Sequence, residues 1–195
     1  MKIFKLKSYI GLALLLFLCL FSFTSCNKDK PTFSQAQTKE MLKQIEGNYH
    51  GSVDVAYYQG KSISKIKDGI GVSSDVLTFK MSLLPMAESI IDESIAMTLR
   101  NINSIEVKAE YKFTQRDNGL IHFKLLPQDV TILGGYGAPP TIKIIFCQNF
   151  GGDAETAMPN KNMMFNISPK ELWINGERYK DFKQLVYHFE GSIHN

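Results

Sequence analysis

Residues 105–125 read IEVKAEYKFTQRDNGLIHFKL, and this stretch decides the fold class. Its first half alternates apolar and charged side chains, which is typical of a β-strand with one buried and one solvated face. The Asp-Asn-Gly sequence at 117–119 supplies residues that tolerate positive φ in a tight turn. The apolar alternation then resumes over 121–125. The stretch therefore predicts an antiparallel β-hairpin, the best-defined part of a β-rich domain.

Alternation with a period of two recurs on both sides of this hairpin and predicts further strands. Asn175 and Gly176 form a two-residue turn signal between two of them. The expected strands lie at 49–57, 62–70, 76–81, 130–133, 141–148, 162–168, 172–174, 177–179 and 184–193. Two segments rich in strand-breaking residues, 134–140 and 151–160, are expected to be loops outside the sheet.

Two helices are expected beside these strands. Ser34 and Gln37 have the spacing of a capping box, so the first helix is expected over 34–46. The second is expected to begin near Pro85 and to run through Leu99, because apolar residues recur there at helical spacing. The fold class is therefore mainly β (α+β): an antiparallel curved sheet, barrel or sandwich with two helices packed on it.

The chain begins with MKIFKLKSYIGLALLLFLCLFSFTSC, residues 1–26. Three lysines precede an uncharged apolar run, and small residues stand directly before Cys26, as in a secretory leader with a cleavage site. The run is shorter than the roughly 20 residues of a membrane-spanning helix. The sequence Phe-Thr-Ser-Cys at 23–26 makes the leader resemble a bacterial lipoprotein signal. An ordinary secretory signal and a retained membrane anchor are the alternatives.

The resemblance to a lipoprotein signal implies that the chain has three parts. Residues 1–25 would be a signal peptide that is removed, residues 26–33 the lipidated Cys26 and a tether, and residues 34–195 a single β-rich domain. The resemblance also implies a diacylglyceryl group on Cys26, so that a lipid anchor holds the protein on a membrane. The tether reaches at most about 25 Å, which keeps the domain near the bilayer surface.

Charge and cysteine content exclude two classes of protein. The leader carries three of the 22 basic residues and none of the 19 acidic ones, so the remainder has 19 of each and a formal charge of zero. Nucleic-acid-binding proteins carry a basic surplus, so no nucleic acid partner is expected. Of the three cysteines, Cys147 alone lies beyond residue 26. A framework of disulfides is therefore excluded, and a core must stabilise the domain.

The sequence contains no recognisable catalytic or cofactor-binding motif. His50, His122, His188 and His194 lack the spacing of metal ligands, so no metal and no cofactor are expected. The glycines at 134–137 precede two prolines rather than the helix of a phosphate-binding loop. Cys147 follows apolar residues in an expected strand, where free cysteine is typically a small buried side chain. A nucleophile elbow of the G-x-S-x-G type and paired carboxylates are also missing.

Aromatic side chains are the remaining candidates for ligand binding. Tyr57 and Tyr58 fall at a strand end, Tyr136 in the glycine- and proline-rich loop, and Trp173 beside a turn. Aromatic rings can stack on sugars or line an apolar pocket, but they pack into cores equally well. For Tyr57 and Trp173 packing is the favoured interpretation.

The layout of leader, tether, helix and β-rich domain resembles small lipoproteins of gut Gram-negative bacteria that carry domains of unknown function. The helix followed by Gly-Asn-Tyr-His-Gly at 47–51 also resembles the lipocalin-like β-barrels. The resemblance implies an outer membrane lipoprotein of the bacterial cell envelope, on its periplasmic or surface face. The expected function is a non-enzymatic binding or accessory domain for a small hydrophobe, a glycan or an envelope protein. The alternatives are a structural component of an envelope complex and a hydrolase of unrecognised type.

Overall fold

The computed structural model describes residues 33–134, 140–148, 150–157 and 161–193. The chain divides into two units, Met1–Thr32 and Phe33–Asn195, and every described element belongs to the second. The expected signal peptide, Cys26 and the tether up to Thr32 lie outside the described residues.

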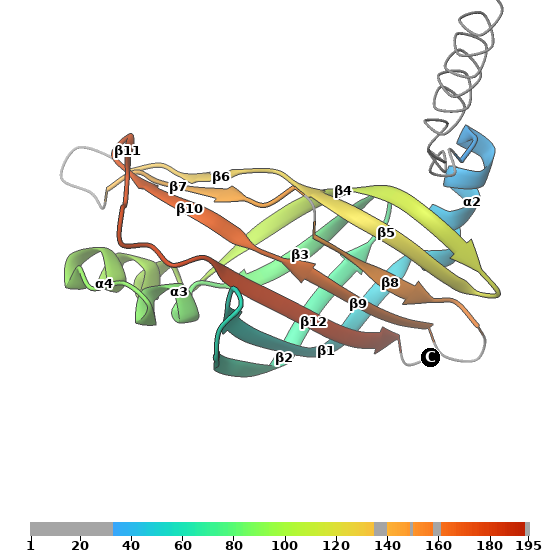
Figure 1. The fold of residues 1–195 in the computed structure, drawn as a ribbon, viewed down its shortest axis with the longest axis horizontal. Coiled ribbons are helices and arrows are strands. Elements are labelled where there is room, and N and C mark those ends of the chain that lie inside the picture. Colours follow the sequence, from blue (N-terminus) through green and yellow to red (C-terminus); the bar gives the residue numbers. More distant parts are fainter. Residues whose placement is uncertain (1–32, 135–139, 149, 158–160, 194–195) are drawn as a thin grey trace, which may run out of the picture. The chain divides into compact units, whose positions relative to one another are not determined.

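Eight strands form a closed antiparallel barrel in the order β1-β12-β9-β8-β5-β4-β3-β2 (Figure 1). Neighbours around the barrel follow the order of the chain once the strands of a second sheet are skipped. The mainly β, antiparallel prediction is confirmed, and of the three architectures the structure shows the barrel. The barrel strands are β1 Gly47–Tyr57, β2 Ser62–Ser73, β3 Val76–Ser82, β4 Ser104–Asp117, β5 Leu120–Pro127, β8 Gly151–Glu155, β9 Lys161–Ile167 and β12 Leu185–Ile193.

Four further strands form a second sheet in the order β11-β10-β7-β6. They are β6 Val130–Ile132, β7 Ile142–Phe146, β10 Pro169–Ile174 and β11 Glu177–Arg178. β6 and β7 follow β5 in the chain, and β10 and β11 follow β9. Because β7 pairs with β10, the two pairs of strands form one sheet. The turn between β10 and β11 is the predicted one, with positive φ at Asn175 and Gly176.

The hairpin at 105–125 is confirmed as β4 and β5. Asn118 and Gly119 have φ of 37° and 90°, which the tight turn requires. One irregularity interrupts the pairing: Phe113 faces Phe123 and Gln115 faces His122, so Thr114 is an extra residue in β4. This β-bulge bends the strand and re-aims the side chains next to it.

The prediction of a loop at 151–160 is wrong for its first half, because residues 151–155 form β8 between β5 and β9. The two glycines look like strand breakers, but here they permit close packing of neighbouring backbones. A Cβ on Gly151 would lie 2.0 Å from the carbonyl oxygen of Phe123, and one on Gly152 would lie 1.9 Å from that of Met164. Every other residue carries a Cβ, so the strand requires glycine at both positions.

Helix α2, Gln35–Ile45, begins at the predicted capping box, with Ser34 as its N-cap. Met41 and Ile45 are fully buried, and the hydroxyl of Tyr49 in β1 donates to the carbonyl of Ile45 at 2.8 Å. The helix therefore packs its apolar side on one end of the barrel (Figure 1).

The prediction of one continuous helix from Pro85 is wrong, because the segment forms two helices, α3 Leu84–Glu88 and α4 Glu93–Ile102. The carboxylate of Asp92 accepts hydrogen bonds from the backbone N–H groups of Ser94 and Ile95, so a new helix begins there. The break leaves Ile91 84% exposed, although it has helical spacing with Ile95 and Leu99. Both helices lie at the end of the barrel away from α2 (Figure 1).

Aromatic side chains fill the centre of the barrel. The rings of Phe165 and Phe189 are stacked with centroids 4.8 Å apart, and the edge of Phe79 meets Phe165 at 5.4 Å. All three side chains are 0% exposed. A side chain that bordered a water-sized void would expose surface to it, so the interior around these rings is packed. Eight strands enclose a space that side chains alone can fill.

Buried tyrosines are expected to make the fold unstable at alkaline pH. Burial raises the pKa of Tyr49 from 10.0 to about 12, and burial also raises the pKa of Tyr111 and of Tyr187. Below pH 10 these hydroxyls are neutral in both states, so stability does not change. Above pH 10 the hydroxyls ionise in the unfolded chain but stay neutral in the folded protein. Each of these tyrosines then lowers the free energy of unfolding by up to about 1.4 kcal/mol per pH unit, until the pH reaches its pKa in the folded protein.

Urea unfolding between pH 8 and pH 12 measures this loss. The variant Tyr49→Phe should be about 1 kcal/mol less stable at pH 8, because the bond to Ile45 is lost, but its stability should fall less steeply above pH 10. Tyr58→Phe, at an exposed position, is the matched control and should follow the wild type. An unchanged slope in the Tyr49→Phe variant would contradict the assignment.

Candidate functional site

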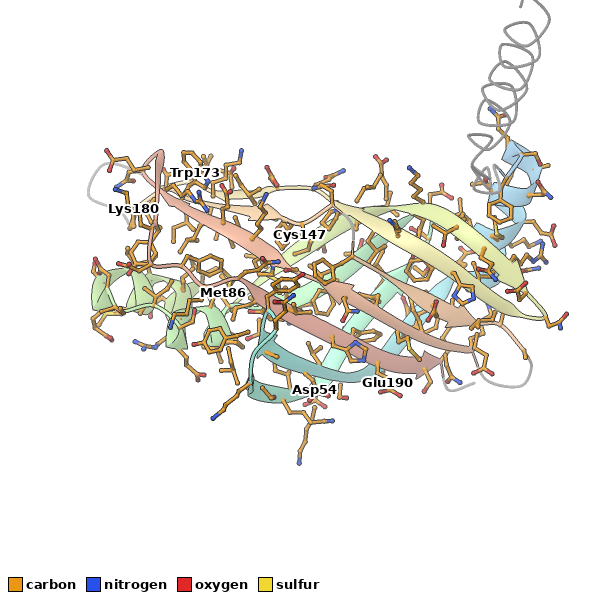
Figure 2. All side chains as sticks on the ribbon, viewed as in Figure 1. Asp54, Met86, Cys147, Trp173, Lys180 and Glu190 are labelled. Atoms are coloured by element: carbon orange, nitrogen blue, oxygen red, sulfur yellow. The ribbon has the colours of Figure 1, made fainter. Side chains whose placement is uncertain are left out.

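The four aromatic residues expected from the sequence do not form one site. Tyr57 is half-buried, with the Lys183 ammonium 5.8 Å from its ring centroid, and Tyr58 packs its edge-on ring against Phe150 at 6.1 Å. Trp173 lies in the second sheet, where its indole N–H donates to Glu171 at 3.0 Å (Figure 2). Tyr136 lies outside the described residues. Tyr57 and Trp173 are half-buried, and Tyr58 is 48% exposed.

Cys147 is half-buried rather than a core side chain, because β7 ends at Phe146 and the cysteine stands just beyond it. Its sulfur accepts from the side-chain amide of Gln184 at 3.2 Å, and the same amide donates to Ser168 at 2.8 Å. The prediction of buried core filler is therefore wrong. These contacts connect the end of β7 to the residues that precede β10 and β12.

A hollow of about 400 Å³ lies on the outer face of the barrel, across β5, β8, β9 and β12. Gly151 and Gly152 line it without side chains, which leaves backbone exposed at this place. The bulged Thr114 of β4 also contributes. The polar side chains that line the hollow are Thr114, His122, Lys124, Asp153, Asn166 and His188.

His122 and Asp153 form the first polar pair in the hollow. They face each other across β5 and β8, and Nδ1 of the imidazole lies 2.5 Å from a carboxylate oxygen. An ionised carboxylate only accepts hydrogen bonds, so Nδ1 carries the proton and donates. The Nε2 atom of a neutral His122 is then an acceptor. The two side chains are 30% and 38% exposed, so a ligand in the hollow can reach them.

His188 and Asn166 form a second pair of the same kind. They are cross-strand partners on β12 and β9, and Nδ1 of His188 lies 2.9 Å from the amide oxygen of Asn166. The amide oxygen also only accepts, so Nδ1 of His188 donates, and the Nε2 atom of a neutral His188 is an acceptor. Two imidazoles are thus held in the same tautomer within one hollow.

A second hollow of about 670 Å³ adjoins the first, and Met164, which is 43% exposed, lines both. Its charged lining is acidic, with Glu155 on β8 and Glu190 on β12. Glu190 and Asp54 both lie on the outside of the barrel (Figure 2). His50 lines this second hollow rather than the first, and His194 lies outside the described residues.

Sequence reasoning missed this site for an identifiable reason. His122 and His188 lie in strands that alternation predicts. Asp153, however, was assigned to a loop, and His122 lies 31 positions before it in the chain. The signal that could have revealed β8 is the pair of glycines at 151 and 152. Paired glycines can mark a close approach of neighbouring strands as well as the end of a strand.

Within the described ranges, no group of three His, Cys, Asp or Glu side chains is arranged to hold a metal ion. No helix that the structure describes is long and apolar enough to cross a membrane.

The fold and the site together define an eight-stranded antiparallel barrel with an aromatic core and a polar hollow on its outer face. Comparison with protein-family models, with curated proteins and with solved structures finds no match to this chain.

Proposed function

We propose that the protein is a lipid-anchored, non-enzymatic binding protein of the bacterial cell envelope, most specifically an outer membrane lipoprotein attached through Cys26. We propose further that it binds a polyhydroxylated ligand of the glycan class in the hollow of about 400 Å³. The lipoprotein-like leader at 1–26 supports the anchor and the compartment. The polar lining of the hollow supports the class of ligand.

The two oriented imidazoles carry the proposal for a glycan. Each offers an Nε2 acceptor, and the Lys124 ammonium offers donors in the same hollow. Sugar hydroxyls both donate and accept, so they can satisfy such a mixed lining. The volume is in the range of small-ligand sites, about 300–1,000 Å³. A small hydrophobe suits this lining less well, and aromatic rings occupy the barrel centre.

The lining also favours binding over hydrolysis. Among the described residues, it contains neither serine nor cysteine, and its one hydroxyl belongs to Thr114. Glycoside hydrolysis typically uses two carboxylates that flank the scissile bond, and Asp153 is the one carboxylate among the described residues that line the hollow. Activity-based probes that labelled Cys147 or a serine would instead favour the hydrolase alternative.

Substitution in the hollow tests the binding function. We expect the purified full chain to bind members of a panel of neutral, amino and acidic oligosaccharides, measured by titration calorimetry. Asp153→Ala and His188→Ala should each weaken binding about tenfold, the effect of losing one hydrogen bond of about 1.4 kcal/mol. Asp75→Ala removes an exposed carboxylate from the turn between β2 and β3 and should leave binding unchanged. Absence of binding across the panel, or equal affinities for all variants, would contradict the proposal.

The anchor has a separate test in cells. Radiolabelled palmitate should enter the wild-type protein, which should fractionate with membranes. Cys26→Ala should lose both the label and the membrane association, while Cys147→Ala, the matched control, should keep both. An ordinary secretory signal predicts soluble protein in every case. A retained anchor predicts membrane association without the label.

A further inference from the structure

We infer that the free edge of β2 binds an extended segment of another protein as an added β-strand. The barrel closes weakly between β2 and β3. Only Gly71, Val72 and Ser73 of β2 pair with β3, although β2 begins at Ser62. On its other side β2 pairs with β1, with two shifts of register, one of which leaves Lys67 and Asp68 as a bulge.

Residues 62–70 of β2 therefore present an open strand edge. No strand that the structure describes pairs with this side of β2. On the opposite side of the gap, Lys80, Met81 and Ser82 of β3 pair with β4 alone. An open edge displays a row of backbone N–H and C=O groups that another extended chain can match. The edge spans about 30 Å at roughly 3.3 Å per residue, which is long enough for a strand of several residues.

A hollow of about 320 Å³ lies where β2 and β3 diverge. Its lining is mixed: Ile70, Val72 and Ile105 are apolar, while Thr78, Lys80, Ser104 and Glu106 are polar or charged. The hollow begins at Ile70, the last residue of the open edge. In recognition by strand addition, backbone hydrogen bonds supply affinity and pockets for alternate side chains supply specificity. The open edge and the hollow are thus the two parts of one peptide site.

Charge on the edge indicates which peptide fits. Lys61, Lys65 and Lys67 are exposed there against one exposed carboxylate, Asp68. Lys65 is already paired with Asp54 of β1 at 3.3 Å, which leaves Lys61 and Lys67 as the available cations. The expected segment therefore alternates apolar residues with Asp or Glu. A second copy of this chain would bring its own lysines against these, and like charges opposite each other destabilise a strand pair.

This site is independent of the glycan hollow and of Cys26. Binding of a peptide at β2 would favour a role in an envelope complex, beside ligand binding on the other strands. Failure of either test leaves the result of the other unaffected.

Selection from a displayed library of random ten-residue peptides, with the full chain as bait, tests the inference. The enriched peptides should alternate apolar and acidic residues, and a synthetic copy should slow amide hydrogen exchange within residues 62–70. Lys67→Glu should weaken that peptide about tenfold. Lys39→Glu on α2, also an exposed lysine, should not change its affinity. A copy of the peptide N-methylated at every second residue should not bind, because strand addition requires its backbone N–H groups.

Three outcomes would overturn the inference. The first is a library without enrichment over an unrelated bait protein. The second is a peptide that binds equally to the Lys67→Glu variant and protects residues outside 62–70. The third is a concentration-dependent dimer protected at 62–70, because the occupant of the edge would then be a second copy.

Discussion

Phe165→Ala is expected to reduce the free energy of unfolding by about 3–5 kcal/mol, the usual cost of truncating a buried aromatic residue. Phe165 is 0% exposed and contacts both Phe189 and Phe79, so its loss would leave a cavity at the centre of the barrel. Domains are stabilised by about 5–15 kcal/mol in total, so the variant should be close to unfolding. Urea denaturation followed by circular dichroism measures the change.

The neighbouring residue provides the control for Phe165. Met164 is 43% exposed on the outer face of the same strand, and Met164→Ala should change stability by less than about 1 kcal/mol. If Phe165→Ala also lost less than 1 kcal/mol, the rings would not be tightly packed. The barrel interior would then be a candidate ligand cavity, and the proposal of an outer-face site would lose its structural support.

Gly152→Ala is expected to cost about 3 kcal/mol, at the upper end for the insertion of one methyl group into a packed site. The added Cβ would lie 1.9 Å from the carbonyl oxygen of Met164 and 2.6 Å from Cα of Phe165. These are backbone atoms, so β8 and β9 must separate to accommodate it. Because Gly152 lines the polar hollow, oligosaccharide binding should be lost as well.

Gly71, a buried glycine of β2, is the control for Gly152. A Cβ on Gly71 would lie 3.4 Å from ring atoms of Phe165 and Phe189, which is ordinary contact with side chains. Gly71→Ala should therefore cost about 1 kcal/mol or less. Equal midpoints of urea unfolding for the two variants would show that the approach of β8 to β9 does not require glycine.

Strand positions and their buried faces were predictable from local pattern. In β4 and β5 the alternation predicts the dry side. Val107, Ala109, Ile121, Phe123 and Leu125 are buried, and Ile105, Tyr111 and Phe113 are half-buried and pack against the core. The two-residue turn at Asn175 and Gly176 was equally predictable, because positive φ restricts the residue types allowed there. Such features depend on neighbours close in the chain, which a single sequence displays directly.

The break between α3 and α4 had a signal that periodicity concealed. Apolar spacing continues across 89–92, so it predicts one helix. Asp92 is a strong N-cap residue, and its side chain bonds two backbone N–H groups in the structure. The N-cap therefore decides the structure here, and the apolar periodicity does not. Asp92 satisfies backbone N–H groups that are free only because a new helix begins there.

The sequence by itself determined most of the strands, their inward faces and the tight turns. Tertiary structure alone decided that the strands close into a barrel, that 151–155 belongs to it, and that His122 meets Asp153. The physical reason is that these features depend on distances between segments far apart in the chain. Whether Gly152 breaks a strand or allows one depends on the backbone of β9 beside it. The residues next to Gly152 in the chain do not show that β9 lies there.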